Sequence, residues 1–67
     1  MDITAFPVDM LMQDRAASLF DIELCEMALA NNITEYGTSE QVAWHLRNNR
    51  KIVGVIDAEL KRRGIQE

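Results

Sequence analysis

The chain has few of the residues that small proteins use as covalent or metal staples. Its 67 residues include one cysteine, Cys25, and one histidine, His45. One cysteine cannot form a disulfide within the chain, and a tetrahedral zinc site would need carboxylates or a second chain. Domains of this size bury only about 60% of their unfolded surface, and self-association is the remaining route to a larger core. We therefore expect no metal, no cofactor and a homodimer.

Other absences exclude whole classes of protein. No run of about 18 apolar residues is present, so we expect no membrane-spanning helix. The first residues, Met-Asp-Ile-Thr, lack the basic start and apolar run of a signal peptide, which predicts a cytoplasmic protein with a reduced thiol. The three glycines are scattered, so the chain has no glycine-rich phosphate loop. Cys25 and His45 are the usual nucleophile and base, but no acid lies at a telling spacing from them, and we expect no enzyme.

The clearest pattern that is present is a heptad repeat in the second half of the chain. Its members recur at alternating steps of four and three: Val42, Leu46, Asn49, Val53, Ile56 and Leu60. This spacing places a narrow stripe on one face of a helix that packs against another helix. Asn49 is the one polar member, and such a residue can fix the register of a helix pair. Alternatively, Asn48 and Asn49 break the helix near 48–50, because asparagine is a poor helix former.

A second helix is predicted upstream, starting at Pro7, which suits the first helical position. Residues from Val8 to Leu29 follow the same alternation of steps. A further apolar row covers another side of this helix: Phe20, Leu24, Met27 and Ala28. We assign this row to a dimer interface, because a helix that is apolar on two sides is buried on two sides. Ser18 with Asp21 resembles a capping box, so a break at 17–18 is the alternative to one continuous helix.

The boundaries of the two helices have local signals. Asn31 or Asn32 suits the left-handed position that ends a helix. Thr38 followed by Gln41 has the spacing of a capping box at the start of the next helix. At the far end, Leu60 is followed by Gly64 and Ile65, and this spacing is typical of a Schellman motif.

These signals divide one all-α domain, 1–67, into five parts. We expect an arm at 1–6, helical segments at 7–31 and 39–63, a loop at 32–38 and a tail at 64–67. Residues 1–35 carry seven acidic and one basic residue, a net charge of −6, and residues 36–67 carry four and six, a net charge of +2. Opposite charges attract across an antiparallel pair; alternatively, the solvated faces of the two halves simply differ in charge. The predicted fold is an antiparallel helical hairpin, with broken helices as an alternative, that dimerises into a four-helix bundle.

The functional expectation is a self-associating protein–protein interaction or regulatory module that binds an unknown protein partner. Its size and composition are typical of small bacterial or phage-encoded interaction proteins. The alternative is a DNA-binding regulator resembling a helix-turn-helix, in which a basic cluster would contact nucleic acid: Arg47, Asn48, Arg50 and Lys51. Against this alternative, the loop is longer than the three or four residues of that motif, and the chain is acidic, with a pI of about 4.8.

Overall fold

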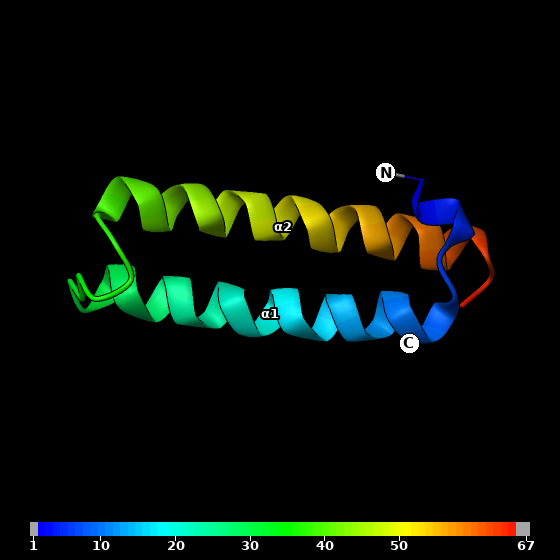
Figure 1. Cartoon of the computed structure of the whole chain (residues 1–67), viewed down its shortest axis with the longest axis horizontal. Helices are drawn as coiled ribbons and strands as arrows, with labels where there is room; N and C mark the ends of the chain where they lie inside the picture. Colours follow the sequence, from blue (N-terminus) through cyan, green and yellow to red (C-terminus); the bar gives the residue numbers. More distant parts are fainter. Residues whose placement is uncertain (1, 66–67) are drawn as a thin grey trace.

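The computed structural model describes residues 2–65. A short 3-10 helix, η1 (Ile3–Ala5), precedes two long helices, α1 (Val8–Ala30) and α2 (Ser39–Arg62). The two long helices lie side by side and antiparallel, with the connecting loop at one end and η1 beside the end of α2 at the other (Figure 1). No strand is found among these residues. The predicted all-α helical hairpin is therefore confirmed, and its dimerisation stays a prediction.

Both helices are continuous, so the breaks considered near 17–18 and 48–50 do not occur. Pro7 was expected as the first helical residue, but it immediately precedes the helix. Its ψ of 152° is extended, and α1 begins at Val8. Proline suits that position as well, because an N–H is not needed there, while the Pro7 carbonyl accepts the first hydrogen bonds of the helix from the Met10 and Leu11 amides at 3.1 and 3.2 Å. Met1 of the expected arm and residues 66–67 of the expected tail lie outside the described residues.

The predicted signals at both ends of α2 are present. The Thr38 hydroxyl accepts a hydrogen bond from the Gln41 amide at 3.2 Å, and the Gln41 side-chain oxygen accepts one from the Thr38 amide at 2.9 Å. This is the reciprocal pair of a capping box. At the other end, the Ile65 amide donates to the Leu60 carbonyl at 2.9 Å, and Gly64 has a φ of +80°. These are the bond and the left-handed residue of a Schellman motif.

The end of α1 uses the same motif without glycine. Asn32 has a φ of +54°, and the Ile33 amide donates to the Ala28 carbonyl at 2.9 Å. Asparagine tolerates this conformation better than other non-glycine residues. Gly37, in the loop, has a φ of +125°, and a Cβ there would lie 2.7 Å from Oε1 of the capping Gln41. A side chain at Gly37 would therefore disturb the start of α2.

The core lies along the contact between the helices. Its buried apolar residues are Leu11 and Ala28 of α1 and Val42, Leu46, Ile56 and Leu60 of α2. Of the apolar residues predicted on the α2 stripe, only Val53 is half-buried rather than buried. Near η1, Ile3, Phe6 and Ile65 pack against the cluster of Leu11, Ile56 and Leu60. The heptad therefore predicted the face of α2 that meets α1.

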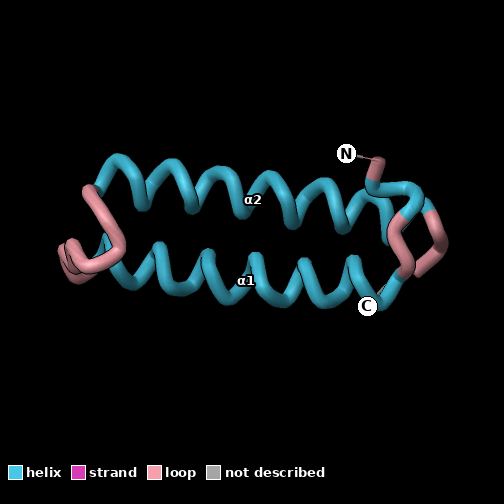
Figure 2. The backbone as a smooth tube through the Cα atoms, in the orientation of Figure 1, coloured by secondary structure: helices cyan, strands magenta, loops and turns pink. Residues whose placement is uncertain are grey.

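The two helices lie side by side in a single layer, which Figure 2 shows face-on. Its principal extents are 40 × 24 × 15 Å, and its radius of gyration is 13.7 Å, against about 11 Å for a compact domain of this length. It exposes 5006 Å², whereas a compact monomer of its mass exposes about 4,300 Å². Within the described part of the chain, neither helix is both long enough and apolar enough to cross a membrane.

Candidate functional site

One side of the hairpin is closed by ion pairs between the helices. Nε of Arg15 in α1 lies 2.6 Å from Oδ1 of Asp57 in α2, and Oε2 of Glu26 in α1 lies 3.2 Å from Nη2 of Arg50 in α2. On α2, the two members are seven residues apart and therefore share one flank of the helix. We call this flank, with its partners on α1, the closed side.

The opposite side has different residues on its flanks. Seven-residue spacing places Asp14, Asp21 and Ala28 on that flank of α1, and His45 and Ile52 on that flank of α2. Because the helices are antiparallel, these two flanks lie side by side on the same face of the hairpin. Among the described residues, no ion pair joins the helices here. We call the surface formed by these flanks, together with the two hollows described next, the open face.

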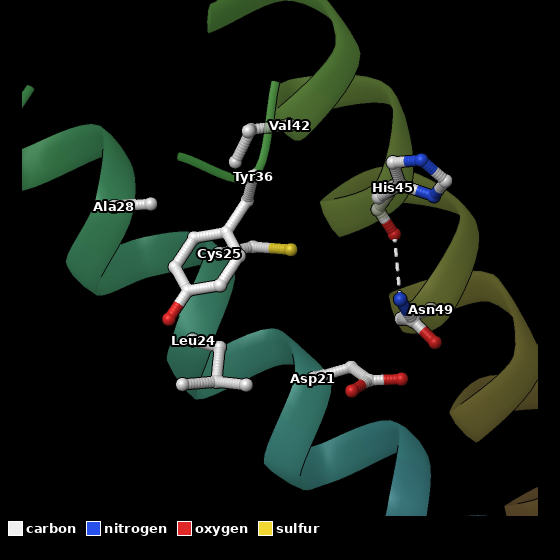
Figure 3. A pocket seen from close by; sticks show the side chains of 8 residues that line it. All are labelled: Asp21, Leu24, Cys25, Ala28, Tyr36, Val42, His45 and Asn49. Carbon is white, nitrogen blue, oxygen red and sulfur yellow. Dashed lines mark hydrogen bonds between the residues drawn. The ribbon is translucent and has the colours of Figure 1, made fainter. Parts of the chain in front are cut away.

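The first hollow of the open face lies near the loop and has a volume of about 180 Å³. It is lined by Asp21, Leu24, Cys25, Ala28, Tyr36, Val42, His45 and Asn49 (Figure 3). Figure 3 shows Cys25 and Asp21 on α1, with His45 and Asn49 on the helix opposite. The Asn49 amide group donates a hydrogen bond to the His45 carbonyl at 2.9 Å. The polar group on the predicted stripe is therefore bonded within its own helix.

Sequence reasoning did not foresee that Asp21, Cys25 and His45 line one hollow. The three residues come from two helices, and only the alignment of the helices brings them together. Their side chains are an acid, a thiol and an imidazole, but among the described residues no hydrogen bond joins the thiol to the imidazole, as nucleophilic catalysis requires. Most of the hollow's exposed lining is apolar. Within residues 2–65, no cluster of His, Cys, Asp and Glu is arranged to hold a metal ion.

The second hollow lies near η1 and has a volume of about 230 Å³. It is lined by Ile3, Phe6, Leu11, Asp14, Lys51, Ile52, Val55 and Ile56. Its wall is mostly apolar, while Asp14 and Lys51 place one charge of each sign on its lining. Val55 is 50% exposed, so this hollow presents apolar surface to the solvent.

Glu59 and Arg63 fasten the N-terminal wall of this second hollow. The buried Glu59 carboxylate accepts hydrogen bonds from Arg62 and Arg63, and Nη2 of Arg63 donates to the carbonyls of Ile3 and Thr4 at 3.2 and 3.1 Å. The hydrogen bonds from Arg62 and then Arg63 lower the pKa of Glu59 to about 2. The same contact raises the pKa of Arg62. The arm is thus held to the end of α2 by charged hydrogen bonds.

The predicted dimer row divides between two surfaces. Phe20 and Met27 are 61% and 55% exposed, on the side of α1 that faces away from α2. Leu24 is half-buried and Ala28 is 2% exposed, and both line the hollow near the loop. The four residues therefore do not form one free row: Ala28 is covered by its own chain, and Leu24 belongs to the open face.

The predicted basic cluster divides as well. Arg47, Asn48 and Lys51 line a shallow outer hollow of about 250 Å³ on α2 together with Trp44, which is 55% exposed. Arg50 instead turns to the closed side, where it pairs with Glu26. Three of the four predicted residues thus share one surface with an aromatic residue that the basic pattern in the sequence did not indicate.

No protein-family model matches the chain, and comparison with curated proteins and with solved structures finds no match. The function is therefore inferred from the geometry of the hairpin. In the described part of the chain, that geometry includes a closed side, an open face with two apolar hollows, and an outer hollow lined by two cations.

Proposed function

We propose that the chain is a small helical protein–protein interaction or regulatory module, without catalytic activity, that self-associates into a four-helix bundle. The single observation that carries this proposal is that the hairpin is one layer thick and leaves an apolar face uncovered. Stable domains are built from packed layers around a shared core. A second hairpin stacked on the first would supply the missing layer and give a bundle of four helices.

The exposed apolar side chains support this proposal. Among residues 2–65, six apolar residues are buried, whereas eight large ones are exposed: Met10, Leu19, Phe20, Met27, Tyr36, Trp44, Ile52 and Val55. Single exposed apolar residues are ordinary, but contiguous ones mark interaction surfaces. Ile52 and Val55 are contiguous with the hollow near η1, since both line it. Covering them would remove apolar surface from water at about 25 cal/mol per Å².

Thermal unfolding at several protein concentrations tests the proposed self-association. When folding is coupled to dimer formation, the melting temperature rises with protein concentration by mass action. We expect such a rise over a hundredfold range of concentration, with unfolding monitored by circular dichroism at the helical wavelengths. A melting temperature that is the same at every concentration would contradict the proposal.

Nucleic-acid binding is the second candidate, and the outer hollow is the observation that favours it. Trp44 lies beside Arg47 and Lys51, and an aromatic ring flanked by cations is suited to stacking a base and holding a phosphate. The two antiparallel helices differ from the nearly perpendicular pair of a helix-turn-helix. Any contact would therefore use this hollow rather than a recognition helix.

Binding to single-stranded and duplex DNA at low ionic strength tests this second candidate. If it holds, affinity falls as salt is raised, and Lys51→Ala reduces both the affinity and its salt dependence. Gln13→Ala, an exposed change on the other helix, is the matched control and should have no effect. An absence of binding at the lowest salt concentration would exclude this candidate.

A further inference from the structure

We infer that the open face is covered by a second copy of this chain, stacked so that α1 of each copy lies on α2 of the other. This inference rests on the proposed self-association and adds the surface and the arrangement. It assigns the interface to the face with the two hollows rather than to the outer row of Phe20 and Met27.

The charges of the two helices decide between the possible stackings. The residues of α1 include five acids and one base, a net charge of −4, and those of α2 include three acids and five bases, a net charge of +2. Stacking α1 on α1 brings acidic helices together, which is unfavourable. Stacking α1 on α2 brings helices of opposite charge together twice in one dimer.

The same complementarity exists on the open face itself. There, α1 contributes Asp14 and Asp21, and α2 contributes Lys51. Among the described residues, none of these three takes part in an ion pair. Their charges are thus available to a second copy that places an acid opposite a base.

The positions of these residues along the long axis of the hairpin, which we call their levels, fit one two-fold arrangement. Asp14 and Lys51 line the same hollow near η1, and Asp21 and His45 line the same hollow near the loop. A two-fold axis parallel to the helices keeps each residue at its level and exchanges α1 with α2 across the interface. Asp14 of one copy then lies at the level of Lys51 of the second copy, and Asp21 lies at the level of His45 of the second copy. Every helix also has antiparallel neighbours, as in up-down bundles.

The outline of the hairpin is large enough to accommodate a stable interface. The rectangle that encloses the hairpin in the plane of the layer measures 40 by 24 Å, so the projected area of either face is at most about 960 Å². A standard interface buries about 800 Å² on each partner. The outer row of α1 is narrower, because it belongs to one helix, and the acidic Glu23 lies beside it, three residues after Phe20.

A charge-exchange experiment tests the arrangement. One variant carries Asp14→Lys with Asp21→Lys, and the other carries Lys51→Glu. In either variant alone, like charges would meet across the interface, so we expect dimerisation at least tenfold weaker than that of the unchanged chain. In an equimolar mixture, each copy meets the opposite charge in the other, and the dimer should return to within about tenfold of the original affinity. Only contacts between chains can produce recovery on mixing.

The closed side provides a matched control. Glu26→Lys and Arg50→Glu reverse an ion pair that lies within one chain. If the open face is the interface, mixing these two variants should leave the weight-average mass from sedimentation equilibrium equal to that of the separate samples. Circular dichroism of every variant confirms that it is helical before mixing.

A second pair of variants covers the case in which a charge variant does not fold. Val55→Asp changes an exposed residue of the open face, and Phe20→Asp changes an exposed residue of the outer row. We expect Val55→Asp to dissociate the dimer and Phe20→Asp to leave it intact.

The possible results separate this inference from the proposed function. A chain that is dimeric but shows no recovery on mixing, or that is dissociated by Phe20→Asp and not by Val55→Asp, overturns the inference and leaves self-association in place. A chain that is monomeric before any change overturns the proposed function itself.

Discussion

Arg15 and Asp57 are 42 residues apart in the chain, yet Nε of the arginine donates to Oδ1 of the aspartate at 2.6 Å. The pair joins α1 to α2 on the closed side. The side chain of Arg15 is only 23% exposed, whereas that of Asp57 is 48% exposed. The pair therefore helps to set which flanks of the helices face each other and which remain open.

A double-mutant cycle measures the contribution of this pair. We expect Arg15→Met and Asp57→Asn to be coupled by about 0.2–1 kcal/mol, the range of partly exposed ion pairs. The measurement is urea unfolding of the two single variants, the double variant and the original chain, and the coupling should fall as salt is added. Strictly additive effects would mean that the pair does not hold the helices together.

Ile56 tests the core directly, because it is buried between the helices. Ile56→Asp would bury a carboxylate without a partner, which costs several kcal/mol, against a total stability of about 3–10 kcal/mol for a domain of this length. We expect the variant to be unfolded by circular dichroism at ordinary temperature. Ala58→Asp, at an exposed position of the same helix, should melt close to the original chain. Equal melting of the two variants would show that Ile56 is not in the core.

Asn49 is half-buried, and its amide group bonds to the His45 carbonyl in the same helix. Because the helix supplies that carbonyl with a partner already, the bond is expendable. Leucine is a better helix former and would add apolar contact, so Asn49→Leu should raise the melting temperature by several degrees. Each 1 kcal/mol is worth about 4–8 °C in a domain of this size.

Asn48→Leu is the control for Asn49→Leu, since it gains helix propensity at an exposed position. A larger rise for Asn49→Leu shows that the side chain faces the seam. Sedimentation of Asn49→Leu tests the predicted role of Asn49 in setting the register, because loss of a polar residue that specifies the register broadens the distribution of oligomers. A lower melting temperature with an unchanged mass would rule that role out.

Glu59 makes the stability of the arm dependent on pH. Its pKa is lowered from 4.5 to about 2 by Arg62 and Arg63, so the folded state favours the ionised carboxylate. The resulting stabilisation is fully present above the ordinary pKa and is lost as the pH falls from about 5 towards 2. In Glu59→Gln, the fall in melting temperature over that range should be smaller than in the original chain. Glu23 is exposed and makes no hydrogen bond to an arginine among the described residues, so Glu23→Gln should follow the original chain. If Glu59→Gln loses as much melting temperature over that range as the original chain, the pH dependence does not arise at Glu59.

Much of the fold was predictable because it depends on local sequence. Thr38 with Gln41, and Gly64 with Ile65, set the ends of α2 through hydrogen bonds that span no more than five residues. The heptad likewise located the buried face of α2, since a period of three and four residues needs no knowledge of the partner. Asn32 took the left-handed position that was expected of Asn31 or Asn32.

The open face was not predictable from the same patterns. Periodicity shows which stripe of a helix is buried, but not which residues of the two helices lie opposite each other. Asp21 and His45 therefore met in one hollow without any signal at the sequence level. Glu59 was also missed, because a buried acid next to Arg62 and Arg63 reads as an ordinary charged end of a helix. Ala28 was predicted in the dimer interface because its contact with the facing helix depends on where the loop directs α2.

Sedimentation equilibrium of the unchanged chain at tens of micromolar is the most direct test of the claim that this hairpin is half of a bundle. We predict a mass about twice the 7.7 kDa of one chain, with dissociation towards one chain on dilution. A mass equal to that of one chain at every concentration would contradict the account.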